Sequence, residues 1–381
     1  MEAVIDQVKR MASNANEVER KEIIDGLRDL SYSLETPDDT LHRVIYLHLQ
    51  ISSVRVGCDL KLFNLLAASD SSLSLDQLHK QTGAAPIFLG RLCRYLASVG
   101  MIKEVGKDKF AATNVTKALS IPGNQAGVYH QFNTIGPVYQ EMPDFLAKIN
   151  YTDITDTANT AHQAAWKSSK PPFAWLAENP QHARYFNDYM MHRRQGMVTW
   201  LDVYPIEKET KGWSSEAPVF VDIGGNIGHQ CAELKSKYPK LPGQVILQDL
   251  PQPISQALST PGVKNMVHDA FEPEPVKGAR FYYMRAILHD WPDHKCREIL
   301  QNIIPAMGPD SAILLDEMVL PDTHVHWQST QTDITMMASL ASIERTKTMW
   351  ADLLDSVGLK IEKVLTYTPS VYESIMTVIR K

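Results

Sequence analysis

The chain has 381 residues, which is long enough for two domains with a sizeable core. Its 38 basic and 44 acidic residues give a formal net charge of −6. That balance excludes the broad positive surface with which nucleic-acid-binding proteins attract phosphates.

The cysteines and the N-terminus both favour a reducing compartment. Cys58, Cys93, Cys231 and Cys296 are scattered without C-x-x-C spacing, so we expect reduced and mostly buried thiols. The first residues lack the basic region and apolar core of a signal peptide, and no apolar run approaches the length of a membrane span. We therefore predict a soluble cytoplasmic protein without a membrane partner.

The first third of the chain is predicted to be helical and to contain a winged helix. Residues 4–34 and 40–68 carry apolar positions at helical spacing among many charges. Two short helices follow at 75–82 and 87–99, each closed by a glycine. Residues 102–112 then alternate around a Gly/Asp turn, which predicts a small hairpin and completes the winged-helix order.

A winged helix invites a DNA-binding interpretation. The candidate recognition helix at 87–99 carries Arg91 and Arg94 but is otherwise mainly apolar, which does not suit a groove lined with phosphates. We therefore favour packing or dimerisation and expect no nucleic-acid partner. The alternative, a winged-helix regulator, predicts DNA binding that weakens steeply with salt.

Residues 128–213 are predicted to be helical and are rich in large apolar side chains. Such residues form core by default, but some could cap a flat apolar substrate. We therefore divide the chain into a winged-helix domain (1–125), a helical cap or linker (126–213) and a catalytic domain (214–381).

The catalytic domain is predicted to begin with a ligand-binding strand, turn and helix. A β-branched run ends at Asp222, the glycine-rich turn 224–228 follows, and residues 230–238 have helical character. Glycines there let the backbone approach a ligand at the carboxyl end of a strand. The next strand ends at Asp249, about 20 residues beyond the turn, as expected for an acid that binds ribose hydroxyls.

The spacing of this turn argues against a dinucleotide. A G-x-G-x-x-G motif is absent, because Ile223 stands two positions before Gly225. The preceding carboxylate of Asp222 would repel phosphates but suits a ligand that carries an ammonium and a sulfonium. The pattern D-x-G-x-x-x-G resembles motif I of S-adenosylmethionine (SAM) methyltransferases, although Asn226 occupies the position of the usual middle glycine.

The rest of the chain alternates strands and helices, which predicts a doubly wound sheet. Further strands are expected at 264–269, 279–288, 312–319, 360–366 and 373–380. The last two are joined by a turn too short for a parallel crossover, so the final strand should be antiparallel. We therefore predict an α/β, Rossmann-like SAM methyltransferase fold, mostly parallel with one antiparallel end strand, preceded by the winged-helix domain.

Candidate catalytic residues lie at the ends of these strands. His289 and Asp290 follow the fourth strand of the domain, Glu317 lies at the end of the fifth, and Glu344 precedes a late helix. A metal cluster that includes Asp293 and His294 is an alternative, but Pro292 interrupts that face and a histidine base needs no metal. Glu344 could also serve only as an acid at a helix N-terminus.

Longer runs make the resemblance specific. The segments 287–291 (ILHDW), 316–321 (DEMVLP) and 344–346 (ERT) resemble the plant and fungal small-molecule O-methyltransferases of the caffeic acid methyltransferase type. The winged helix resembles the dimerisation domain of that family, and residues 130–137 resemble its fungal members. The resemblance implies a homodimer that uses SAM and releases S-adenosylhomocysteine (SAH).

The resemblance also implies roles for the matching positions. The implied base is His289, oriented by Glu317 and Glu344. The implied cofactor-binding residues are Asp222, Gly224, Gly225, Asp249, Asp269, Ala270, Phe271 and Arg285. Among them, the resemblance places Gly224 at the methionine end of SAM, Asp249 at the ribose, and Asp269 with Ala270 and Phe271 at the adenine. The implied substrate-binding residues are His130, Phe132, Phe186, Met190, Asp290 and Met336.

The predicted reaction is methyl transfer to a hydroxyl, which we expect to be phenolic, of an aromatic or polyketide-like small molecule. A phenol with a pKa of about 10 would give its proton to an imidazole with a pKa of about 6.5, a mismatch of about 4.8 kcal/mol. A flanking carboxylate would narrow that gap. An alternative is a SAM-binding pericyclase, because some fungal relatives of this fold catalyse pericyclic rearrangements with the bound sulfonium as an electrostatic aid. Those relatives replace the base with another cationic side chain, whereas this chain keeps His289, so the sequence favours methyl transfer.

Overall fold

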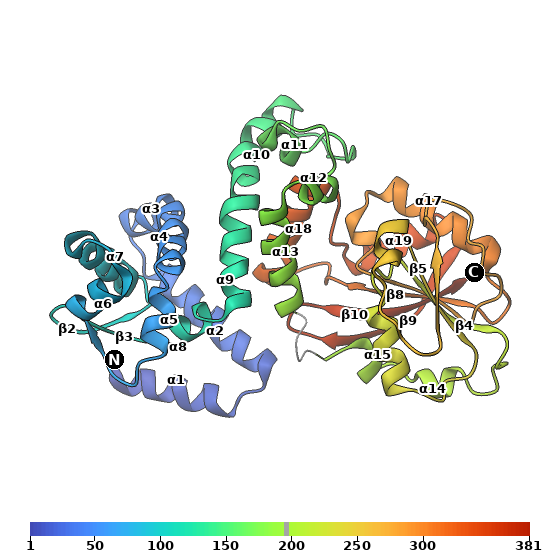
Figure 1. Ribbon diagram of the computed structural model, residues 1–381, viewed down its shortest axis with the longest axis horizontal. Coiled ribbons are helices and arrows are strands. Elements are labelled where there is room, and N and C mark those ends of the chain that lie inside the picture. The colour runs from blue at the N-terminus through green and yellow to red at the C-terminus, as the bar shows by residue number, and fades with distance from the viewer. Residues whose placement is uncertain (194–197) are drawn as a thin grey trace. The chain divides into compact units, whose positions relative to one another are not determined.

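The computed structural model describes residues 1–193 and 198–381. The chain forms two compact units (Figure 1). Unit 1 comprises Met1–Asp144 and Ala164–Met197, and unit 2 comprises Phe145–Gln163 and Val198–Lys381. The three-part division made from the sequence stays a prediction.

Unit 1 is mainly helical. Its helices and short strands are α1 (Glu2–Asn14), α2 (Glu17–Ser33), α3 (Pro37–Ile45), α4 (Leu47–Asp59), α5 (Leu62–Ala67), β1 (Leu73–Ser74), α6 (Leu75–Thr82), α7 (Pro86–Ser98), β2 (Lys103–Gly106), β3 (Lys109–Ala111), α8 (Asn114–Leu119), α9 (Pro122–Tyr129), the π-helix η1 (His130–Ile135), α10 (Gly136–Lys148), α12 (Pro172–Glu178) and α13 (Pro180–Arg193). The helix α10 begins in unit 1 and ends in unit 2, whereas α11 (Ala161–Trp166) begins in unit 2 and ends in unit 1. No helix among the described residues is both long and apolar enough to cross a membrane.

The winged helix predicted from the sequence is present. The side chain of Ser74 caps α6 by accepting the N–H of Gln77, and Gly83 ends the helix with a left-handed φ of 71°. The strands β1, β3 and β2 then form an antiparallel three-stranded sheet in that order. Leu78 and Leu89 of the two helices and Phe110 of β3 belong to one buried cluster, which fixes the wing against the helices.

Unit 2 is built on a seven-stranded sheet. Its strands are β4 (Pro218–Ile223), β5 (Gln244–Asp249), β6 (Val263–Val267), β7 (Phe281–Arg285), β8 (Ala312–Met318), β9 (Leu359–Thr368) and β10 (Glu373–Arg380). They are ordered β6-β5-β4-β7-β8-β10-β9. The first five are parallel, and β10 is antiparallel to both of its neighbours. The mostly parallel sheet with an antiparallel final strand is therefore confirmed, with β10 lying inside the sheet and β9 at its edge.

Helices cover both faces of this sheet (Figure 1). They are η2 (Trp200–Asp202), α14 (Ile206–Glu209), α15 (His229–Lys237), α16 (Pro251–Ser255), η3 (Leu288–Asp290), α17 (Asp293–Ile303), η4 (Ile304–Ala306), α18 (Trp327–Leu340) and α19 (Lys347–Asp355). Alternate residues of a strand point to opposite faces, so Tyr282 packs with α17 and α19 whereas Tyr283 packs with η2 and α15. Two apolar layers result, which is the doubly wound arrangement.

One predicted strand is shorter than expected. The sequence predicts a strand at 279–288, but β7 ends at Arg285. Ala286 adopts a left-handed φ of 51°, and the N–H groups of Ile287 and Leu288 donate to the side chain of Glu317 instead of a neighbouring strand. The chain therefore leaves the sheet three residues early and forms the turn that carries His289.

Candidate active site

The glycines of the first turn have no room for a side chain. Gly224 has a left-handed φ of 70°, and a Cβ there would lie 2.6 Å from Cδ1 of Ile287. A Cβ on Gly225 would lie 2.5 Å from Cδ1 of Leu247 and from the carboxylate of Asp222. The left-handed φ at Gly224 and the crowding of Gly225 by Asp222 and Leu247 therefore favour glycine at these positions.

Asn226 stands where the motif usually has a glycine, and its conformation explains why it fits. Its φ is 54°, a left-handed value that asparagine tolerates better than most residues. Its backbone N–H donates to Oδ2 of Asp249 at 2.7 Å. The asparagine therefore preserves the turn and orients the neighbouring acid.

The two acids of the predicted cofactor site have different environments. Asp249 also accepts the N–H of Leu250 through Oδ1 at 2.7 Å, so both oxygens are oriented and each keeps a free lone pair for a ribose hydroxyl. Asp222 is only 1% exposed, and its carboxylate accepts the thiol of Cys231 at 3.4 Å. Burial raises the pKa of Asp222 to about 7. In this structure the buried carboxylate of Asp222 packs against the glycine turn at Gly225.

The residues predicted to contact adenine follow β6. The Oδ1 atom of Asp269 accepts the N–H of Phe271 at 3.0 Å, which holds the short turn through Ala270. The ring of Phe271 packs edge-on against Trp291, with 4.8 Å between ring centroids. Since Trp291 follows His289 and Asp290, the predicted adenine wall and the predicted catalytic turn share a contact.

Arg285 ends β7 in a buried polar cluster. Its Nε lies 3.6 Å from Oδ2 of Asp316, and the hydroxyls of Tyr283 and Tyr367 donate to the same carboxylate at 2.6 and 2.5 Å. Burial, the largest single influence, opposes the charge of Arg285, but Asp316, Tyr283, Tyr367 and Glu373 together outweigh it and raise the pKa of the guanidinium above its usual value. This ion pair orients Arg285; its contact with a cofactor stays a prediction.

Both ring nitrogens of His289 face carboxylates. Nδ1 lies 2.8 Å from Oε1 of Glu344, and Nε2 lies 3.4 Å from Oδ1 of Asp290. The Glu344 side chain is 1% exposed, and its backbone N–H donates to Asp333 of α18 at 2.8 Å. Burial alone would lower the pKa of His289, but the charges of Asp290, Glu344 and Glu317 raise it to about 10.

Glu317 supports the histidine through the backbone. Its Oε1 accepts the N–H of Ile287 at 3.1 Å and of Leu288 at 2.9 Å, whereas no hydrogen bond joins it to the imidazole within the described residues. Burial raises the pKa of Glu317 to about 7, although the charge of His289 and the two amides oppose that rise. Of the two predicted flanking acids, Glu344 contacts the imidazole ring, whereas Glu317 binds the backbone of the turn that carries His289.

Arg345 is a residue of this site that the sequence analysis missed. Its guanidinium is fully buried and donates to the backbone oxygens of Leu288 at 2.9 Å and Trp291 at 3.0 Å. It also pairs with Asp293 at 2.8 Å. The carbonyls on either side of His289 are therefore fixed by one side chain. The signal was its place beside Glu344 in the segment Glu344-Arg345-Thr346.

These contacts also bear on the metal alternative. Oδ1 of Asp293 accepts from both Nε and Nη2 of Arg345, and its other oxygen lies 3.7 Å from Arg297. The described part of the chain contains no group of three or more His, Cys, Asp or Glu side chains arranged to hold a metal ion. Asp293 thus has arginine partners in place of the proposed metal.

The predicted substrate residues divide between the units. Asp290 and the half-buried Met336 of α18 belong to unit 2. In unit 1, the ring of the buried His130 lies 5.4 Å from that of Phe186, and Phe186 and Met190 are one turn apart on α13. Phe132 is half-buried in the π-helix η1, a conformation that is often found at functional sites.

His130 is held neutral. Burial lowers its pKa to about 4, and His182 adds to the effect. Its buried Nδ1 has no hydrogen-bond partner among the residues that the structure describes. A buried nitrogen without a partner is costly, so it is well suited to bind a ligand.

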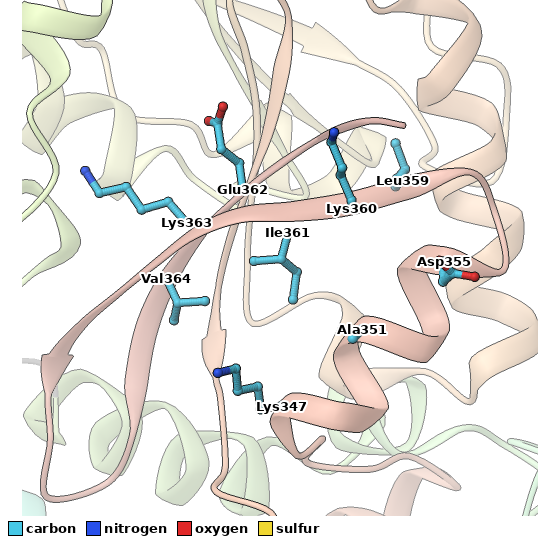
Figure 2. A pocket seen from close by; sticks show the side chains of 9 residues that line it. All are labelled: Lys347, Ala351, Asp355, Leu359, Lys360, Ile361, Glu362, Lys363 and Val364. Carbon is cyan, nitrogen blue, oxygen red and sulfur yellow. The ribbon is translucent and has the colours of Figure 1, made fainter.

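A surface groove of about 580 Å³ lies elsewhere in unit 2, between α19 and the edge strand β9 (Figure 2). Ile361 points toward α19, whereas Lys360 and Glu362 point to the other side of the strand (Figure 2). None of the predicted site residues lines this groove. It is therefore a feature of the sheet edge and not of the strand ends that carry His289.

Comparison with known proteins decides the family. Residues 154–360, more than half of the chain, match the O-methyltransferase domain. The chain belongs to the O-methyltransferase family. Residues 44–120 match the O-methyltransferase dimerisation domain, so the winged helix of unit 1 is the family's dimerisation module.

Fungal members of the O-methyltransferase family resemble the whole chain. O-methyltransferase ucdC of Aspergillus ustus is 39% identical over 100% of both chains, and demethylsterigmatocystin 6-O-methyltransferase of Aspergillus parasiticus is 39% identical over 96% of this chain and 95% of its own. Two solved structures, described as a pericyclic reaction enzyme and as LepI in complex with SAM, are each 40% identical over 100% of this chain and 98% of theirs, with a TM-score of 0.89.

These findings confirm the predicted family, fold and enzyme class, with SAM as the cofactor of the family. They also confirm the resemblance to fungal secondary-metabolite O-methyltransferases. They leave open which reaction the turn around His289 performs.

Proposed function

We propose that this enzyme moves a methyl group from SAM to a phenolic hydroxyl of an aromatic or polyketide-like small molecule, with His289 as the general base. The observation that carries the proposal is the placement of His289 against the buried carboxylate of Glu344, at the end of a strand of the same sheet as Asp249. The 6-O-methyltransferase named above supports an acceptor of this kind.

The raised pKa of His289 suits proton removal from a phenol. With an imidazole pKa of about 10, the mismatch of about 4.8 kcal/mol for an unperturbed imidazole nearly vanishes, because a phenol also has a pKa of about 10. Glu344 stabilises the imidazolium that forms, and Asp290 lies on the side of the ring that would receive the proton. The stronger base acts in the fraction of enzyme whose imidazole is neutral, so the rate should depend on pH.

Residues of unit 2 would hold SAM. Asp249 would bind ribose hydroxyls, and the turn at Gly224 and Gly225 would let the backbone approach the methionine part of SAM. When bound, SAM supplies an electrophilic methyl group on a sulfonium. We assign Phe186 and Met190 to the apolar substrate wall, with the neutral His130 as a hydrogen-bonding group.

A pericyclase is a second candidate, and one observation favours it. Both ring nitrogens of His289 face carboxylates, so the doubly protonated imidazolium satisfies both contacts. The resemblance assigns to pericyclases of this fold another cationic side chain in place of the base, and the imidazolium of His289 would supply a positive charge at that position. The solved relative described as a pericyclic reaction enzyme supports this candidate.

The product distinguishes the two reactions. Incubation with methyl-labelled SAM and a panel of hydroxylated aromatic compounds, followed by mass spectrometry, should give a labelled product heavier by one methylene group. His289→Ala should lower the rate by about 10² to 10⁴ while SAH still binds in calorimetry. Undiminished methylation by this variant would remove His289 as the base, and product of unchanged mass with intact SAM would establish the pericyclic reaction.

We also propose that the enzyme is a homodimer in the cytoplasm. The match of residues 44–120 to the dimerisation domain supports the dimer. The four cysteines are free and buried, which suits a reducing compartment. Sedimentation velocity of the full chain tests the first proposal, and fractionation of the producing cells tests the second.

A further inference from the structure

Two buried polar residues of unit 2 lie next to the predicted cofactor residues and have no part in the reaction at His289. Gln248 precedes Asp249 at the end of β5, and Glu274 lies in the loop that follows β6. The two residues are 0 and 1% exposed. Their side chains are joined, because Nε2 of Gln248 donates to Oε1 of Glu274 at 2.9 Å.

Gln248 connects this pair to the glycine turn. Its backbone oxygen accepts the N–H of Gly224 at 2.9 Å and of Gly225 at 3.1 Å. The residue that follows it is Asp249, the predicted ribose-binding acid. Gln248 therefore contacts the turn through its backbone and the loop after β6 through its side chain.

Glu274 holds the loop that carries the predicted adenine-binding residues. Its Oε1 also accepts the N–H of Val276 at 2.7 Å, and its own N–H donates to the backbone oxygen of Asn302 of α17 at 3.2 Å. The side chain of Asn302 donates in turn to the backbone oxygen of Ala270 at 3.4 Å. The segment from Ala270 to Val276, which includes Phe271, is therefore held at both ends.

His268 links the same carboxylate to β5. Its Nε2 lies 3.8 Å from Oε2 of Glu274, and its backbone N–H donates to the backbone oxygen of Asp249 at 3.0 Å. The next residue is Asp269, the predicted adenine-binding acid. The contacts of Glu274 thus reach the chain beside both acids that are predicted to bind the adenosine part of SAM.

The stability of the fold does not account for this polar pair. Oε1 of Gln248 and Oε2 of Glu274 are buried without a hydrogen-bond partner among the described residues, which is costly. Met266 and Val276, which contact the pair, belong to the apolar layer that packs with α17. Apolar side chains of similar shape would fill this space without leaving those oxygens unpaired. Polar residues that are kept against such a cost mark a functional constraint.

We infer that Gln248 and Glu274 are positioning residues for the adenosine part of SAM. Their hydrogen bond joins the strand that carries the glycine turn and Asp249 to the loop that carries Asp269 and Phe271. It therefore sets the distance between the predicted ribose-binding and adenine-binding groups. The inference rests on the proposed placement of SAM at Asp249, but it is independent of which reaction occurs at His289.

The test measures SAH binding to the full chain by calorimetry. Gln248→Met keeps a side chain of similar length and removes the hydrogen bond, so SAH should bind about tenfold more weakly. Methylthioadenosine, which has the adenosine of SAM without its amino acid, should lose affinity by the same factor. Glu274→Met should behave like Gln248→Met, and the double variant should lose no more than either single one, because both act through one hydrogen bond. Glu274→Gln keeps an accepting oxygen and should retain affinity within about twofold.

Thr210→Val is the matched control for a merely structural role. Thr210 is 1% exposed, and its hydroxyl donates to the backbone oxygen of Ile206 at 2.8 Å. The neighbouring Glu209 accepts from Arg280, just before the start of β7, so this control lies at the opposite ends of the strands. Thermal unfolding of the ligand-free enzyme should show a loss of stability in Thr210→Val, whereas its SAH affinity should stay at the wild-type value.

Three outcomes would contradict the inference. They are wild-type affinity for both ligands in Gln248→Met, equal losses in Glu274→Gln and Glu274→Met, and a loss of SAH affinity in Thr210→Val as large as that in Gln248→Met. Asp249→Ala tests the placement of SAM separately and should weaken SAH binding in any case. Wild-type affinity in Asp249→Ala would refute that placement, whereas a loss in Asp249→Ala without a loss in Gln248→Met would refute only the role of Gln248 and Glu274.

Discussion

Glu317 and Arg345 hold the same backbone turn, one through its N–H groups and the other through its carbonyl oxygens. The carboxylate of Glu317 accepts the N–H groups of Ile287 and Leu288, whereas the guanidinium of Arg345 donates to the carbonyls of Leu288 and Trp291. Both side chains are buried, so these charge-assisted hydrogen bonds are shielded from water. The turn that presents His289 is therefore fixed from both sides, independently of the contact between His289 and Glu344.

This relationship predicts the effect of Arg345→Lys. An ammonium cannot reproduce the fork that reaches two carbonyls and Asp293 at once, so His289 should lose its alignment. We expect kcat to fall by about 10- to 100-fold while SAH affinity changes by less than about threefold. Steady-state kinetics and calorimetry measure the two quantities.

Arg297→Lys is the matched control. Arg297 lies 3.7 Å from the same Asp293, but it is 41% exposed and its Nε donates to Ser356. We expect near wild-type kcat from this variant, since exposed ion pairs contribute little. Equal losses of kcat in the two variants would show that Asp293, and not the hold on the turn, carries the effect.

Replacing Glu344 or Glu317 by glutamine should change the pKa of His289 by different amounts. Glu344→Gln removes the charge that contacts Nδ1 of His289, so the pKa of His289 should fall and the plateau value of kcat at high pH should drop by about 10- to 100-fold. Glu317→Gln should shift the pKa of His289 less, because Glu317 contacts the backbone. Titration of the His289 ring by NMR, with His289→Ala to assign its signal, checks the order of these shifts. A larger shift in Glu317→Gln would contradict this division of roles.

Much of unit 2 could be predicted because its signals are local. The spacing of Asp222, the glycines and Asp249 follows from one strand, turn and helix, and parallel strands bring their ends to one edge. The hold of Arg345 on the turn could not be predicted, because it joins side chain to backbone across more than 50 residues. The early end of β7 at Arg285 has the same origin, since Glu317 takes the amides that a longer strand would use.

Unit 1 shows a second limit of sequence reasoning. Helical periodicity predicted amphipathic helices in the first 34 residues, but it could not tell that their apolar sides stay uncovered within one chain. The spacing of apolar residues indicates which side of a helix is packed, but it does not indicate what that side packs against. Likewise, no residue type in 130–135 distinguishes the π-helix from the expected α-helix.

The glycine turn predicts an ordered series of SAH affinities. Asn226→Gly should retain wild-type affinity, because glycine adopts a φ of 54° freely. Asn226→Ala should weaken binding by up to about tenfold, since a left-handed alanine costs about 1–2 kcal/mol. Gly225→Ala should weaken it most, because its Cβ would meet Leu247 and Asp222 at 2.5 Å. Calorimetry with SAH gives the series, and an unchanged affinity in Gly225→Ala would contradict the packing described for this turn.

The pH dependence of the reaction separates the two candidate functions by its sign. With a pKa of about 10, His289 is mostly charged at neutral pH, and a base must be neutral before it takes a proton. The kcat/KM for methyl transfer should therefore rise about tenfold per unit between pH 7 and 9, and Glu344→Gln should move the plateau to lower pH. A pericyclic reaction that needs the imidazolium should instead be constant over that range and fall only as the pH approaches 10. A flat profile for a methylated product would show that proton removal by His289 does not limit the reaction.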